Sequence, residues 1–236
     1  MVKANGLRFR TLVEGPPDGD MVLMMHGFPE GAESWARQMH VLAHAGFLAV
    51  APDLRGYGLT DAPEGVENYG MEHLVADAKG LIEAFGRTSA HIAGHDWGAV
   101  VAWYFAGAHP DMTVTLTALS VGHPAALAAM PERVVEGFVR SMTRPGRLTA
   151  GLNYYRANLK TGGAAWERLQ RMGDITSPTQ LIWGDQDPAL GRRQAEQTRA
   201  HVKGRFHLEV LEGAGHWLQF ERPDEVALAL SQVTAI

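Results

Sequence analysis

The sequence contains no cysteine among its 236 residues, and this absence excludes disulfides, a thiol nucleophile and cysteine-ligated zinc. No apolar run approaches the length that crosses a bilayer, and the first residues show no apolar signal segment. Positive charge is not in excess either, because the formal net charge is -5. We therefore expect no binding to nucleic acid or membrane, and the cytoplasm is the default location.

Signatures of metal and nucleotide sites are also missing. The eleven histidines are scattered, and no His-Glu-x-x-His segment is present. Nothing resembles a P-loop, and Gly56-Tyr57-Gly58 is too short to be a dinucleotide fingerprint. The sequence thus predicts a protein that needs neither a metal nor a cofactor.

Apolar runs that are typical of buried strands alternate along the chain with segments of helical spacing. Hydrophobic residues make up 46% of the chain, which is enough for one full core. Strands alternating with helices predict an α/β fold, with a mostly parallel sheet and helices on both faces. The expected strands span 7–14, 21–25, 47–51, 91–93, 114–119, 180–183 and 206–211, and the main expected helices span 34–45, 74–85, 99–108 and 223–233.

One segment, 123–173, breaks this alternation because it contains no strand-like run. Within it, residues 134–142 keep helical spacing. Ligands of open α/β sheets bind at the carboxyl ends of the strands, where such an insertion can close a site. We therefore predict a core formed by 1–122 and 174–236, covered by a shortened helical lid of 123–173.

The central feature of the sequence is Gly94-His95-Asp96-Trp97-Gly98, between a predicted strand and a predicted helix. A reactive side chain with glycine two residues away on either side is typical of a nucleophile elbow, whose sharp turn needs small flanking residues. The alternative interpretation is a glycine-bounded turn in which Asp96 only caps the following helix.

The usual elbow residue is serine, and its replacement by Asp96 narrows the chemistry. A serine that attacked a saturated carbon would leave an ether, which no general base in a protein could hydrolyse. A carboxylate that attacks the same carbon leaves an ester, which activated water can cleave. The elbow therefore indicates displacement at a carbon that carries an epoxide oxygen or a halide.

Together with four other motifs, the elbow resembles the α/β-hydrolase fold family, within it the branch of epoxide hydrolases and haloalkane dehalogenases. The motifs keep the family order over nearly the whole chain. They are His26-Gly27-Phe28-Pro29, Asp53-Leu54-Arg55-Gly56-Tyr57-Gly58, Gly94-His95-Asp96-Trp97-Gly98, Trp183-Gly184-Asp185-Gln186-Asp187-Pro188 and Gly213-Ala214-Gly215-His216.

The resemblance implies a triad of Asp96 as nucleophile, Asp187 as acid and His216 as general base, in the chain order that this fold uses. His216 also lies in a glycine-rich loop after the last predicted strand, at the sheet edge of the elbow. Its ordinary pKa lies near working pH, which suits a base that takes a proton from water. Asp185, in the same loop as Asp187, is the alternative acid.

The backbone N–H groups of Phe28 and Trp97 correspond to the oxyanion hole of the family. His95, next to the nucleophile, is interpreted as structural. As substrate-binding residues we predict Tyr154, His26, Pro29, Trp35 and Phe138.

Opening an epoxide also needs an acid for the departing oxygen, and epoxide hydrolases carry lid tyrosines for this purpose. Tyr154-Tyr155-Arg156 resembles one such stretch and assigns the acid to Tyr155. The family has a second, upstream tyrosine, but 123–152 contains none. We therefore predict an epoxide hydrolase, acting on a small apolar epoxide and water, as a monomer or homodimer. The alternatives are a haloalkane dehalogenase with the same triad and a binding protein with a degenerate lid.

Overall fold

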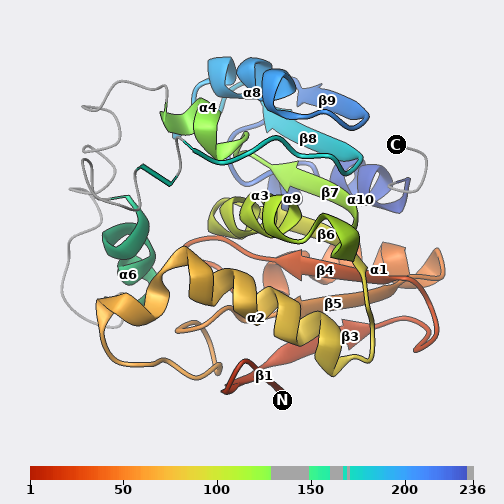
Figure 1. The fold of residues 1–236 in the computed structure, drawn as a ribbon. Coiled ribbons are helices and arrows are strands. Elements are labelled where there is room, and N and C mark those ends of the chain that lie inside the picture. Colours follow the sequence, from red (N-terminus) through yellow and green to blue (C-terminus); the bar gives the residue numbers. More distant parts are fainter. Residues whose placement is uncertain (129–148, 160–166, 169–170, 233–236) are drawn as a thin grey trace.

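The computed structural model describes residues 1–128, 149–159, 167–168 and 171–232 (Figure 1). The described residues form a central sheet of seven strands, in which β3 at one edge is antiparallel to β5 and all other neighbours are parallel. The order across the sheet is β3 (Thr11–Glu14), β5 (Leu48–Pro52), β4 (Met21–Met25), β6 (Ala90–His95), β7 (Thr113–Leu119), β8 (Thr179–Gly184) and β9 (Phe206–Leu211). The predicted α/β fold with a mostly parallel sheet is confirmed.

The amino-terminal strand differs from the prediction, which placed one strand over 7–14. The chain instead forms a separate hairpin of β1 (Val2–Ala4) and β2 (Leu7–Phe9), and β3 then joins the main sheet. Asn5 and Gly6 between β1 and β2 both adopt positive φ, which favours the tight turn. The prediction missed β1 because a strand of three residues carries too little periodicity to be recognised.

Helices cover both faces of the sheet, because every residue of central strands such as β4 and β6 is buried. Met21, Leu23 and Met25 of β4 pack into one hydrophobic cluster, whereas Val22 and Met24 pack into the other, because successive strand residues point to opposite faces. One face carries α2 (Met71–Ala84), α3 (Trp97–Ala108) and α8 (Arg192–Thr198), and the other carries α1 (Ala36–His44), α9 (Leu218–Glu221) and α10 (Pro223–Ser231) (Figure 1).

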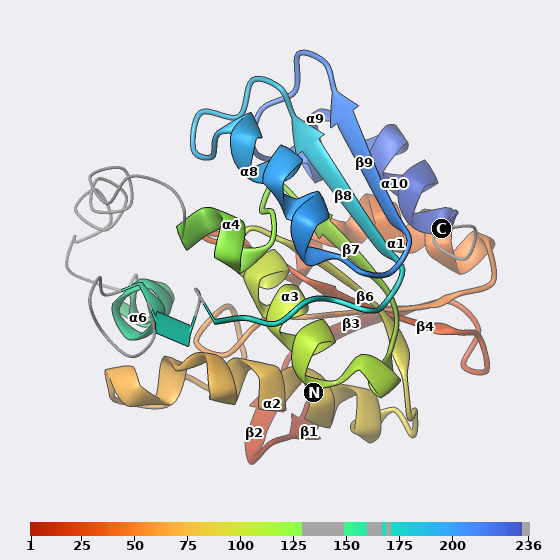
Figure 2. The ribbon, with the colours of Figure 1, turned by 45° about the horizontal axis from the view of Figure 1, so that its top comes forward.

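Shorter elements complete the described fold. The 3-10 turns are η1 (Ala32–Trp35), η2 (Val66–Tyr69), η3 (Pro110–Met112) and η4 (Arg199–His201). Two helices of the predicted lid range are described, α4 (Pro124–Ala128) and α6 (Thr149–Asn158), and α6 lies beside η2 in both ribbon views (Figure 1 and Figure 2). The division into core and lid stays a prediction.

The parallel strands bring the loops that carry the sequence motifs to one end of the sheet, where the carboxyl ends of the strands lie. The chain leaves the carboxyl ends of β4, β5, β6, β8 and β9 on the same side, although these strands are far apart in sequence. No helix in the described ranges is long and apolar enough to cross a membrane.

Candidate active site

Asp96 occupies a strained turn between β6 and α3, as expected of a nucleophile elbow. Its backbone has φ 49° and ψ -119°, a conformation that L-residues rarely adopt. A Cβ atom on Gly94 would overlap with the Gly98 carbonyl, and one on Gly98 would overlap with the Met25 carbonyl of β4. The two glycines are therefore required because backbone passes directly over both positions.

The carboxylate of Asp96 faces two functional groups from other parts of the chain. Asp96 Oδ1 accepts a hydrogen bond of 2.9 Å from the Phe28 N–H, and Oδ2 lies 3.5 Å from His216 Nε2. Within the described part of the chain, this side chain makes no capping hydrogen bond to α3. The geometry thus argues against the interpretation of Asp96 as a mere helix cap.

His216 lies between two carboxylates, one on either side of its ring. Its Nδ1 lies 2.7 Å from Asp187 Oδ2, while Nε2 faces Asp96. Asp187 Oδ1 accepts hydrogen bonds from the Ala189 and Leu190 N–H groups at 2.7 and 3.0 Å, which fixes the carboxylate. Asp185 instead accepts a bond from a backbone N–H near the surface, at Gly213. Of the two candidate acids, the structure brings Asp187 to the histidine.

The buried charges in this cluster shift one another's ionisation. Burial alone favours the neutral imidazole of His216, but its hydrogen bonds with Asp187 and Asp96, and their negative charges, raise its pKa to about 10. Burial alone would raise the pKa of Asp96, but the hydrogen bond and charge of His216 hold that pKa below its ordinary value. At neutral pH the resting site therefore contains an ionised Asp96 beside an imidazolium.

A second buried network supports the His216 backbone, and sequence reasoning missed most of its members. The His216 carbonyl accepts hydrogen bonds from His95 Nε2 at 2.8 Å and Ser120 Oγ at 2.7 Å. The other ring nitrogen of His95 lies 3.0 Å from Glu30 Oε1, and Glu30 Oε2 accepts a 3.3 Å bond from the Gly27 N–H. His95 thus holds the His216 backbone, which agrees with the structural role expected for it. The sequence signal for Glu30 was its position, as the acid directly after the His26-Gly27-Phe28-Pro29 motif.

Tyr155 lies over both residues that were assigned to the oxyanion hole. Its ring packs edge-on against Trp97 at a centroid distance of 4.8 Å and against Phe28 at 6.0 Å. Burial and the negative charge of Asp96 raise the pKa of Tyr155, so its hydroxyl is protonated at neutral pH. Trp97 begins α3, where backbone N–H groups have no intrahelical partner. The structure therefore gathers the Asp96 carboxylate, backbone N–H donors and a neutral phenol.

The residues predicted to bind substrate have varied surroundings. His26 is buried and accepts a 2.9 Å bond from the Leu54 N–H at Nε2, and burial lowers its pKa, so it links two loops as a neutral ring. Pro29 is exposed beside the site, after a cis peptide bond to Phe28. Phe138 lies outside the described residues.

Two other residues that were predicted to bind substrate are fully buried. Trp35 is fully buried in the hydrophobic cluster of α1 and α10, because η1 turns its ring onto the sheet. Tyr154 is also fully buried, and its hydroxyl donates a 3.0 Å bond to the Arg55 carbonyl. Both side chains pack in the core, and their part in substrate binding stays a prediction. Among the described residues, no group of three or more acidic, histidine or cysteine side chains could hold a metal ion.

Comparison with known proteins assigns this chain to a family. The model of the "Alpha/beta hydrolase family" matches residues 22–230. Epoxide hydrolase A of Mycobacterium tuberculosis is 31% identical, over 98% of this chain and 95% of its own. That alignment runs over 305 positions, whereas this chain has 236 residues, so the relative has segments that this chain lacks. The AB hydrolase superfamily protein YfhM of Bacillus subtilis is 30% identical, over 94% of this chain and 92% of its own.

Solved structures agree with the family model. The crystal structure of epoxide hydrolase A from Mycobacterium thermoresistibile superposes with a TM-score of 0.83 at 30% identity, covering 98% of this chain and 96% of that one. The fold, the elbow and the relatives thus lead to the same assignment. The chain belongs to the alpha/beta hydrolase family, in the branch that contains the epoxide hydrolases.

Proposed function

We propose that this protein is an epoxide hydrolase, which converts a small apolar epoxide to a vicinal diol through an ester on Asp96. The observation that supports this most directly is the position of the Asp96 carboxylate, between the Phe28 N–H and a His216 that is paired with Asp187. The relatives named epoxide hydrolase support the substrate class. We keep the cytoplasm as the proposed location and a monomer or homodimer as the proposed state.

In the first step, an oxygen of Asp96 attacks an epoxide carbon, and the bond from that carbon to the epoxide oxygen breaks. The departing oxygen takes the proton of Tyr155, whose raised pKa keeps the phenol protonated until the alkoxide develops. Packing against Trp97 and Phe28 holds the phenol near Asp96. The product of this step is a hydroxyalkyl ester, and solvent later restores the proton of Tyr155.

Once the ester has removed the charge of Asp96, the His216 imidazolium loses its proton to solvent. In the second step, the neutral His216 takes a proton from water, and the resulting hydroxide attacks the carbonyl carbon of the ester. The negative charge that develops on the carbonyl oxygen is stabilised by the N–H groups of Phe28 and Trp97. When the intermediate collapses, the bond from the carboxyl carbon to the diol oxygen breaks. His216 returns its proton to that oxygen. The new carboxyl group of Asp96 then gives its own proton to His216, which restores the resting pair of carboxylate and imidazolium.

A single turnover of styrene oxide in heavy-oxygen water tests this mechanism. With enzyme in excess, the first diol should carry an oxygen from Asp96, and the heavy oxygen should appear in the Asp96 carboxylate by peptide mass analysis. Asp96→Asn should abolish turnover, and His216→Ala should form the ester and then stall. A first diol labelled directly from water would show that Asp96 acts as a base and would refute the ester. A haloalkane assayed in parallel covers the dehalogenase alternative.

A further inference from the structure

The helix α6, which carries Tyr155, is attached to the hydrolase core by its neighbouring side chains. It lies against η2, close to the start of α2 (Figure 2). Tyr154 and Asn158 are both buried on the side of α6 that faces the core, whereas Tyr155 is half-buried beside Trp97. Residues at i and i+4 share one helix face, so Tyr154 and Asn158 form one contact surface.

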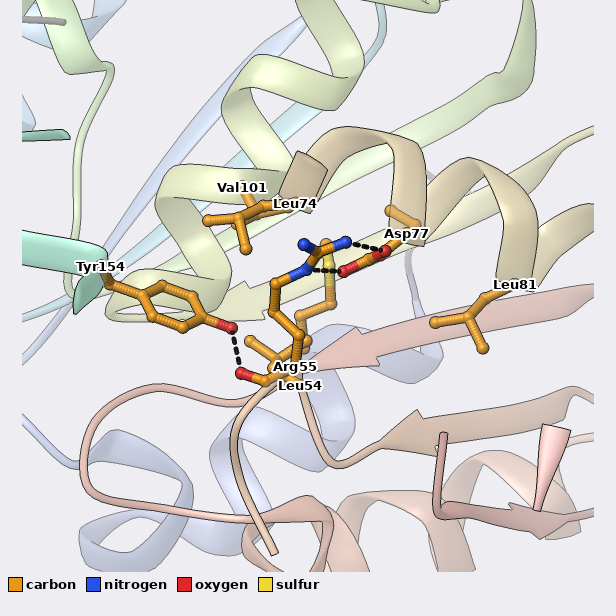
Figure 3. Close-up of a pocket in the computed structure, with 9 residues that line it drawn as sticks. Leu54, Arg55, Leu74, Asp77, Leu81, Val101 and Tyr154 are labelled. Atoms are coloured by element: carbon orange, nitrogen blue, oxygen red, sulfur yellow. Dashed lines mark hydrogen bonds and ion pairs between the residues drawn. The ribbon is translucent and has the colours of Figure 1, made fainter. Parts of the chain in front are cut away.

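The first attachment is a hydrogen bond to a loop that is itself held by a buried ion pair. The Tyr154 hydroxyl donates to the Arg55 carbonyl at 3.0 Å, and the guanidinium of Arg55 makes two bonds of 2.5 and 2.6 Å to Asp77 of α2 (Figure 3). Arg55 and Asp77 are 3% and 4% exposed. A bidentate pair of this kind, away from solvent, fixes the carbonyl to which Tyr154 bonds.

The space around this ion pair is too small for a substrate. Its volume is about 10 Å³, which suffices for about one water molecule. Mainly apolar side chains line it, among them Leu74, Leu81 and Val101 (Figure 3). The pair therefore belongs to the packed core and acts on the site only through the loop that it holds.

The second attachment is the amide of Asn158. Its Oδ1 accepts a 2.9 Å bond from the Met71 N–H at the start of α2, and its Nδ2 donates a 2.9 Å bond to the Tyr69 carbonyl. At the other end of the helix, a Cβ atom on Gly151 would lie 3.0 Å from the ring of Phe28. The backbone of α6 thus closely approaches the loop that carries Phe28, while Asn158 satisfies buried backbone groups at the start of α2.

We infer that Tyr154 and Asn158 are positioning residues, which fix the phenol of Tyr155 over Asp96 by attaching α6 to the core. This inference rests on the proposed function, in which Tyr155 is the acid. The requirement is strict because 123–152 supplies no second tyrosine to share the role. A displacement of about 1 Å at a reacting group can slow a reaction about a hundredfold, so a looser α6 weakens proton donation without changing the triad.

The test measures ester formation and ester hydrolysis separately. Enzyme in excess over styrene oxide is quenched at intervals, and the intact mass gives the rise and decay of the ester. Tyr154→Phe and Asn158→Ala should each slow ester formation about tenfold or more. Ester hydrolysis should stay unchanged, because His216 and Asp187 do not contact α6 through these side chains. Tyr104→Phe, which removes a phenol hydroxyl from α3, is the matched control and should change neither rate.

A double-mutant cycle with Tyr155→Phe distinguishes positioning from general loss of stability. If Tyr154 acts through Tyr155, Tyr154→Phe should have no further effect on ester formation once the Tyr155 hydroxyl is absent. Equal slowing in both backgrounds would overturn the inference, as would a normal rate in Tyr154→Phe while Tyr155→Phe is slow. A normal rate in Tyr155→Phe would refute the proposed acid and the inference with it. If Asn158→Ala does not fold, Tyr154→Phe carries the test alone, since it removes one atom.

Discussion

Neutralising Asp96 should lower the pKa of His216, because Asp96 supplies one of the two negative charges beside the ring. The resting pKa of His216 is about 10, against an ordinary value of 6.5. Asp96 Oδ2 is 3.5 Å from Nε2, whereas Asp187 Oδ2 is 2.7 Å from Nδ1. The Asp96 side chain is 18% exposed and that of Asp187 is 1% exposed, so solvent screens the charge of Asp96 more strongly.

An opposite charge at such distances shifts a pKa by roughly one to three units. The longer distance and greater exposure of Asp96 favour the lower part of that range. In Asp96→Asn we therefore expect the pKa of His216 to fall by about one to two units, which corresponds to about 1.4–2.7 kcal/mol. In the proposed mechanism the same change accompanies catalysis, since the ester also removes the charge of Asp96. Ester formation itself would thus raise the fraction of neutral imidazole, the form that accepts a proton from water, by about tenfold to a hundredfold.

The assay is a pH titration of the imidazole nitrogens by NMR in protein with labelled histidine. His216→Gln assigns the signal among the eleven histidines. The matched control is Asp111→Asn. Asp111 lies in η3, at the amino end of β7 and away from the site, so this variant removes one carboxylate without changing the surroundings of His216. Intact mass must show that the amide introduced by Asp96→Asn has not hydrolysed. An unchanged or higher pKa of His216 in Asp96→Asn would refute this account of how the base is released.

Three further predictions concern stability and packing. Because the folded-state pKa of His216 lies above its unfolded value, its contribution to the free energy of unfolding is full below about pH 6.5 and is lost as pH rises through about 10. Urea titrations should therefore show a steeper loss between these pH values in the wild type than in His216→Ala, and parallel curves would contradict this. Trp35→Ala should lower the free energy of unfolding by about 3–5 kcal/mol, measured with urea, because the ring is fully buried. The KM of the folded fraction should stay unchanged, and a raised KM would support the predicted role of Trp35 in substrate binding. Gly98→Ala should prevent folding or melt far below the wild type because its Cβ meets the Met25 carbonyl, whereas Gly173→Ala, with open space around it, should melt normally; equal melting temperatures would contradict the close approach.

The sequence by itself determined the fold and the candidate nucleophile, because local patterns indicate both. Buried strands such as 21–25 and 180–183 are largely apolar runs. The glycines at 94 and 98 have the spacing of an elbow, and this spacing is independent of residues elsewhere in the chain. The identity of Asp96, in place of serine, restricts the reaction through the bond that the attacking atom forms. None of these features requires knowledge of which residues meet in space.

Only the tertiary structure decided which side chains meet at the sheet edge. Asp185 and Asp187 differ by two positions in one loop, and the contact with His216 depends on how β8 and β9 place their loops. Tyr154 and Tyr155 are adjacent in sequence, but successive helical residues point about 100° apart, so one is buried against the core and the other lies over Trp97. Such contacts join segments that are far apart in the chain. They depend on the order of the strands and on the packing of α6, and a local sequence pattern carries no information about either.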